Sequence, residues 1–91
     1  MTMSTDHAFL NQIINKIDIL AAMTLRGVDV QVVLKRTIED VSSYLINTKN
    51  SDPKVFLLTL KNRLTVLADR VDPSMDGYRK VLQEAASLIK L

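Results

Sequence analysis

Apolar residues recur at three- and four-residue spacing along almost the whole chain, and this periodicity limits the fold more than any other feature. It is the spacing of one face of an α-helix. We therefore predict four amphipathic helices, over residues 6–26, 29–48, 53–71 and 73–90. Their inner faces are assigned Phe9, Leu10, Ile13, Ile14, Ile17, Leu20, Ala21 and Met23; Val30, Val33, Leu34, Ile38, Val41, Tyr44 and Leu45; Phe56, Leu57, Leu60, Leu64, Leu67 and Val71; and Met75, Tyr78, Val81, Leu82, Ala85, Leu88 and Ile89.

The breaks between these segments carry residues that end or begin helices. Gly27 suits the left-handed conformation that closes a helix at its carboxyl end. An Asp-Pro step occurs twice, at residues 52–53 and 72–73. Because an Asp side chain caps free N–H groups and Pro tolerates the first helical position, we predict that each step opens a helix. Gly77 indicates either a close helix contact or a frayed first turn.

A chain of 91 residues is long enough for one hydrophobic core and too short for two. Val28, Val30 and Val32 alternate as in a β-strand, but the helical period continues after them and no second strand is available for pairing. Short connections between long helices favour antiparallel neighbours. The sequence thus predicts an all-α, single-domain, antiparallel four-helix bundle.

Composition limits the cellular setting. The chain has no cysteine, which excludes disulfides and thiolate metal sites, and its start has no secretory pattern. No uncharged run reaches the length of a membrane-spanning helix. The net charge of +2 comes from 12 Lys and Arg against 10 Asp and Glu, typical of a mixed solvated surface. We expect a cytoplasmic protein, with association at a membrane surface left open.

Few residues suggest chemistry. His7 is the only histidine, lies near the amino terminus, and is expected to be exposed or to act as a cap. Asp72 and Asp76 are four residues apart, yet both are explained by helix starts. No phosphate-binding loop or catalytic motif occurs. We therefore expect no catalytic residue, no metal and no cofactor, and a protein that is not an enzyme.

Five apolar residues fall outside the predicted inner faces of the first and third helices: Ile19, Leu25, Val55, Leu58 and Val66. A bundle helix needs only about three apolar positions in seven. Helices that carry more apolar residues than this have two explanations. Either these helices lie more centrally than the others, or a partner, including a second copy of the chain, covers the extra residues.

Basic residues gather loosely on the third and fourth helices, and Gly27 lies in a short turn between the first two. A short turn that contains Gly27 between two helices is compatible with a helix-turn-helix DNA-binding regulator. However, Asp69, Asp76 and Glu84 interrupt the basic residues, and the second helix offers only Gln31, Lys35 and Arg36 for base contacts. Nucleic acid is therefore not the expected partner.

The second half of the chain, "DPKVFLLTLKNRLTVLADRVDPSMDGYRKVLQEAASLI", resembles the immunity proteins that protect lactic-acid bacteria from their own pediocin-like bacteriocins. "VQVVLKRTIEDVSSYL" is a fainter match. The resemblance implies an intracellular antiparallel bundle that recognises the bacteriocin bound to its receptor, the membrane part of a mannose phosphotransferase system. It also implies that the last helix and carboxyl-terminal region choose the partner. The chain departs from the family pattern in having few Glu residues and no extended polar tail.

A second resemblance links "NTKNSDPKVFLL" to the turn and second helix of type III secretion needle subunits, which self-assemble. Pro73 would interrupt the long helix of such a subunit. On the immunity interpretation, the candidate partner-contact residues lie at the turn between the third and fourth helices and on the outer side of the last helix. They are Arg70, Asp72, Ser74, Asp76, Arg79, Lys80, Gln83 and Lys90.

Overall fold

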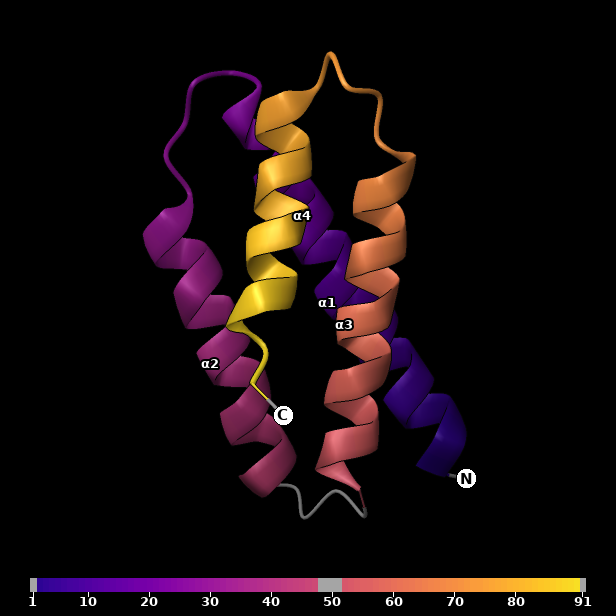
Figure 1. Cartoon of the computed structure of the whole chain (residues 1–91). Helices are drawn as coiled ribbons and strands as arrows, with labels where there is room; N and C mark the ends of the chain where they lie inside the picture. The colour runs from indigo at the N-terminus through magenta and orange to yellow at the C-terminus, as the bar shows by residue number, and fades with distance from the viewer. Residues whose placement is uncertain (1, 48–51, 91) are drawn as a thin grey trace.

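A computed structural model describes residues 2–47 and 52–90, with side chains from residue 7 onward. Within this part of the chain four helices run alternately up and down (Figure 1). The prediction of an all-α four-helix bundle is confirmed. The helices are α1 (Thr2–Thr24), α2 (Gln31–Asn47), α3 (Pro53–Arg70) and α4 (Asp76–Leu88).

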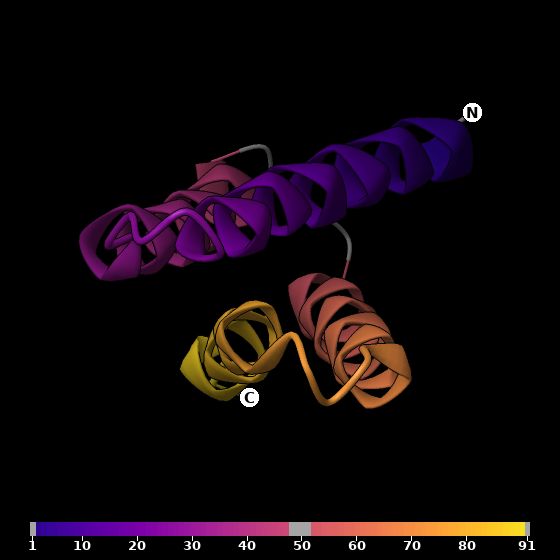
Figure 2. The same ribbon diagram turned by 90° about the horizontal axis from the view of Figure 1, so that it is seen from above.

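The helices form two layers, with α1 and α2 in one and α3 and α4 in the other (Figure 2). The long helix α1 crosses behind α3 and α4 at an oblique angle. Although α4 is the shortest helix, it contacts all three of the others, and its most extensive contacts are with α3 and α1. One side of α4 is therefore enclosed and the opposite side faces solvent.

The core lies where the inner faces of all four helices meet. Its largest completely buried side chains come from every helix, because each contributes at least one position of its apolar period. They are Ile17, Leu34, Leu45, Leu60, Leu64 and Leu82. Removal of each such side chain from water contributes about 1.5–3 kcal/mol.

The end of α1 confirms the role predicted for Gly27. This residue has φ +82°, in the left-handed region. Its N–H donates to the carbonyl of Thr24 at 3.0 Å, and the N–H of Val28 donates to the carbonyl of Met23 at 3.2 Å. These two bonds form a Schellman motif that satisfies the last carbonyl groups of the helix.

The first Asp-Pro step opens a helix as predicted. Asp52 is the N-cap of α3, Pro53 is its first residue, and Asp52 Oδ1 accepts a hydrogen bond from the N–H of Val55 at 3.2 Å. The start of α2 is less accurately predicted. Asp29 precedes this helix and accepts from the N–H of Gln31 at 3.0 Å, so the regular helix begins two residues later than expected.

The prediction for the second Asp-Pro step is wrong. Pro73 and Ser74 form a turn, and α4 begins three residues after Pro73, at Asp76. The carboxylate of Asp72 accepts from the N–H of Ser74 at 2.9 Å, and its carbonyl accepts from the N–H of Met75 at 2.8 Å. Asp72 therefore closes a turn and does not cap a helix. The N-cap of α4 is Met75, whose side chain makes no capping bond.

Of the two explanations for Gly77, the close helix contact agrees with the structure. Gly77 lies within the first turn of α4, opposite the last residue of α1. A Cβ atom placed on it would meet Thr24 Oγ1 at 3.4 Å. The amino-terminal end of α4 is thus seated directly on the carboxyl-terminal end of α1.

The remaining helix ends differ from prediction by a few residues. Helix α1 begins at Thr2 and ends at Thr24, where residues 6 and 26 were expected. Helix α4 ends at Leu88, where residue 90 was expected. Residue 48, the predicted end of the second helix, lies outside the described residues.

Candidate interaction surfaces

The structure separates the eight predicted contact residues into four places. Asp72 and Ser74 lie in the turn before α4, and Arg70 lies at the end of α3. Asp76, Arg79, Lys80 and Gln83 lie on α4, and Lys90 lies two residues beyond its end. Seven of the eight are exposed, and Arg79 is half-buried with no hydrogen-bond partner for its Nε within the described part of the chain. Arg79 is therefore only partly available to a partner.

Four of the residues are exposed along α4 and just after it, and are here called the α4 face: Asp76, Lys80, Gln83 and Lys90. The four- and three-residue spacing of Asp76, Lys80 and Gln83 places them on one side of the helix, whereas Lys90 follows the end of α4 at Leu88. Lys80 Nζ lies 3.0 Å from Asp76 Oδ2, and both side chains are well exposed. An exposed pair of this kind contributes at most about 1 kcal/mol, so the two groups can exchange partners at little cost.

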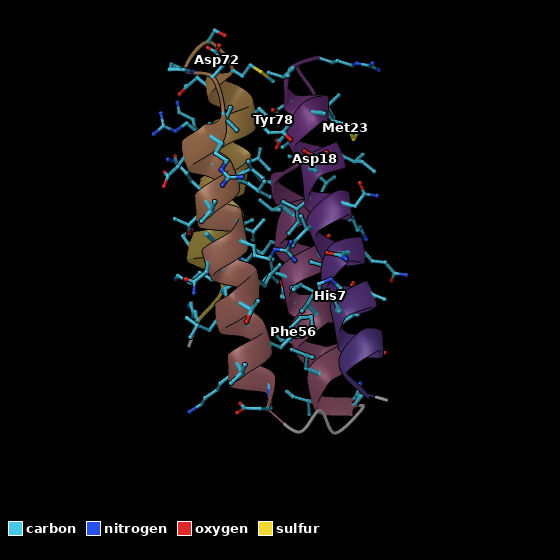
Figure 3. The ribbon with its side chains drawn as sticks, turned by 90° about the vertical axis from the view of Figure 1, so that its right-hand side faces the viewer. His7, Asp18, Met23, Phe56, Asp72 and Tyr78 are labelled. Atoms are coloured by element: carbon cyan, nitrogen blue, oxygen red, sulfur yellow. The ribbon has the colours of Figure 1, made fainter. Side chains whose placement is uncertain are left out.

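The turn before α4 presents one carboxylate in a fixed position. The backbone hydrogen bond from Ser74, with a further contribution from the Ser74 side chain, lowers the pKa of Asp72 below its ordinary value of 3.8. The carboxylate of Asp72 is therefore ionised at neutral pH and is held beside the start of the α4 face, above the bundle (Figure 3).

Arg70 belongs to a different surface, a groove of about 320 Å³ between α1 and α3. Arg63 crosses this groove, with its Nη1 donating to Asn11 Oδ1 at 3.4 Å. None of the α4 residues lines it. That Arg70 joins the α4 residues in one contact surface stays a prediction. The lining residues are Asn11, Ile14, Asn62, Arg63, Val66, Leu67 and Arg70.

The five apolar residues outside the predicted inner faces are all exposed. Their side chains range from 46% exposed at Leu58 to 57% at Val55, and the others are Ile19, Leu25 and Val66. The explanation that α1 and α3 lie more centrally than the other helices is therefore wrong, since α4 has that position. Isolated exposed apolar residues are normal, whereas contiguous ones indicate an interface.

Three residues assigned to the core from the sequence are also exposed: Met23 at 37%, Val33 at 47% and Tyr44 at 43%. The interpretation of Met23 as a core residue is wrong, and Figure 3 shows it pointing away from α3 and α4. The converse error concerns Thr37, which is buried while its Oγ1 donates to the carbonyl of Val33 at 2.8 Å. A threonine gives no sign of burial in a sequence.

Of these exposed residues, Tyr44 lines an open groove of about 260 Å³ between α1 and α2. At its lower end the ring of Phe9 packs against Tyr44, with centroids 4.2 Å apart, and against Phe56 of α3, with centroids 5.5 Å apart. Lys16 and Asp40 stand on opposite sides of the groove. The complete lining is Phe9, Gln12, Ile13, Lys16, Thr37, Asp40, Val41 and Tyr44.

His7 is exposed on α1, as predicted. In residues 2–47 and 52–90, no three His, Asp or Glu residues are grouped so that they could hold a metal ion. No helix of the described chain combines the length and the apolar composition required to cross a bilayer.

Comparisons with protein-family models, with curated proteins and with solved structures find no match to this chain.

Proposed function

We propose that this chain is a protein-binding module that catalyses no reaction, and that it protects a bacterial cell by recognising a pediocin-like bacteriocin on its membrane receptor. The observation that carries the proposal is the exposed polar surface formed by the α4 face and the adjoining turn. It occupies the part of the chain where the resemblance to immunity proteins locates partner recognition. The bundle fold is also the fold implied by that resemblance.

The packing of α4 suits this role. Its buried side contacts α1, α2 and α3, so we expect its backbone to keep one shape when a partner binds. A surface that is already ordered loses little conformational entropy on binding. The α4 face carries both signs of charge, at Asp76, Lys80 and Lys90. Charges on an exposed surface mainly determine which partner is accepted and how fast it associates.

The test is protection of a bacteriocin-sensitive strain that expresses the chain. We expect growth in the presence of at least one pediocin-like peptide. The double variant Lys80→Glu/Lys90→Glu should lose protection, because it reverses both positive charges of the α4 face without touching a buried residue. The control Lys35→Glu/Arg36→Glu makes the same charge change on exposed positions of α2 and should protect as well as the parent.

Two outcomes would count against the proposal. Killing by every peptide of a broad pediocin-like panel, with the protein present at normal levels, would exclude the immunity function. Equal protection by both double variants would retain that function and remove the α4 face as the recognition surface. Helix content measured by circular dichroism confirms that each variant is folded.

The self-assembling needle subunit receives less support from the fold. Such a subunit needs one long second helix, whereas residues 53–88 form two helices with a turn at residues 71–75.

A further inference from the structure

The side of the α1–α2 layer that faces away from α3 and α4 has the same spacing of residues on both helices. We call it the α1–α2 face. Positions four, three and four residues apart lie on one side of a helix. On α1 these positions are Gln12, Lys16, Ile19 and Met23, and on α2 they are Val33, Thr37, Asp40 and Tyr44; Thr37 is buried and the other seven are exposed.

The two helices run in opposite directions, so the rows align as an antiparallel pair. Lys16 and Asp40 line the same groove from opposite sides, and both are exposed. The lower end of the face is aromatic, with Tyr44 packed on Phe9. Its upper end is aliphatic, with Met23 and Val33. The face thus carries apolar side chains at both ends, with Gln12 beside the aromatic end, and one positive and one negative charge near its middle.

We propose that the chain forms a symmetric dimer in which the α1–α2 faces of two copies pack against each other. A two-fold axis parallel to the helices, running between α1 and α2, places α1 of one protomer opposite α2 of its partner at the same height. Lys16 of each copy then meets Asp40 of the other, and each apolar end meets an apolar end. An interface of this symmetry forms every contact twice.

A two-fold axis perpendicular to the helices would give the opposite result. It would place α1 on α1 and α2 on α2, which brings Lys16 toward Lys16 and Asp40 toward Asp40. Like charges at an interface are strongly unfavourable. The charges on the face therefore favour a single arrangement of the two copies.

The apolar residues of the face supply a second argument. Met23, Val33 and Tyr44 continue the core periodicity of α1 and α2 and yet are exposed in the single chain. A second copy would bury them. The molecule measures 40 × 24 × 21 Å along its principal axes. A long side is therefore large enough in projection to hold a standard interface of about 800 Å² per partner. The α4 face lies in the other layer and stays accessible.

Charge reversal followed by mixing tests the dimer. Sedimentation velocity of the unmodified chain at micromolar concentrations should show a dimer. Lys16→Glu places two carboxylates opposite each other at each symmetry-related contact, and Asp40→Lys places two cations there. Each single variant should dimerise about tenfold more weakly or worse. An equimolar mixture of the two should dimerise like the unmodified chain, because each variant supplies the charge that the other needs.

Restored dimerisation in the mixture identifies a contact between molecules. A defect that acts only within one chain would not be corrected by adding a second variant. Lys35→Glu, which reverses a charge at an exposed position of α2 outside the face, serves as the control and should leave the dimer intact. A chain that is monomeric at all micromolar concentrations would overturn the proposal and leave the face for a different partner. A dimer insensitive to both reversals, or single variants that mixing does not rescue, would overturn it as well.

Discussion

The two Asp-Pro steps of this chain have the same dipeptide and opposite structural results. Asp52 and Pro53 begin α3, and the residue three positions after the proline is Phe56, which is buried in the core. Asp72 and Pro73 form a turn, and the residue three positions after this proline is Asp76, which is exposed and only then begins α4. An Asp-Pro step therefore marks a change of chain direction, and the residues after it decide where the helix begins.

The difference has a local physical cause. After Pro53 the chain continues with residues that extend a helix, so the Asp52 side chain reaches the N–H three positions ahead. After Pro73 comes Ser74, and Asp72 bonds to the N–H only two positions ahead, which closes a turn. Gly77 also lowers helix propensity in the four residues that follow Pro73. The first turn of α4 then lies beside the last residue of α1, where a Cβ on Gly77 would be at ordinary contact distance, 3.4 Å, from Thr24 Oγ1.

The largest expected effect on stability comes from a substitution after the first Asp-Pro step, at residues 52–53. Phe56→Ala removes a ring that is only 8% exposed and that packs against Phe9. We therefore expect a loss of about 3–5 kcal/mol in the free energy of unfolding. The matched variant after the second corner is Tyr78→Ala, which should cost less because Tyr78 is only half-buried. Urea denaturation measures both values. Equal losses would contradict the interpretation that only the first Asp-Pro step is followed by an aromatic residue of the core.

A smaller effect separates a helix cap from a turn. Asp52→Ala removes the side-chain bond to the N–H of Val55 and should cost about 1 kcal/mol in the free energy of unfolding. Asp72→Ala removes a bond in an exposed turn and should cost less. Thermal denaturation of the two variants side by side gives the comparison. A larger loss at Asp72 than at Asp52 would reverse the assignment of cap and turn.

The smallest expected effect is the pH dependence of stability that Asp72 causes in the turn at the second Asp-Pro step. Because hydrogen bonds from Ser74 favour the ionised carboxylate, the pKa of Asp72 in the folded chain lies below 3.8. The stability that this group contributes is fully present above the unfolded value of 3.8 and is lost as the pH falls through the lower folded value. NMR titration of the Asp72 carboxyl carbon measures the midpoint, and Asp72→Asn identifies its signal by removing it. A midpoint at or above 3.8 would show that the turn bond does not form.

Much of the fold follows from the sequence because burial in a small bundle obeys the helical period. That period correctly places Ile17, Leu34, Leu60 and Leu82 in the core. It also fixes Gly27 as the end of α1, since only glycine adopts positive φ without strain. The start of α4 could not be predicted in the same way. The bonds that Asp72 accepts from Ser74 and Met75 close a turn before this helix, and periodicity carries no information about such a turn.

The candidate surfaces are harder to predict for a related reason. The sequence identifies which side of α4 is polar, but Arg70 falls into the α1–α3 groove because α1 crosses obliquely behind α3. The exposure of Met23 and Val33 also depends on how α1 and α2 are placed relative to the second layer. A period shows that a residue belongs to an apolar face. It does not show whether that face is covered within the same chain or by another molecule.

The central position of α4 has a consequence for how the molecule opens. A helix of 13 residues is too short to persist alone in water, so α4 exists only while the three other helices surround it. Its backbone amides should therefore exchange with deuterium at the rate of complete unfolding, whereas the ends of the longer α1 can fray independently. The shortest helix thus reports the cooperativity of the whole chain.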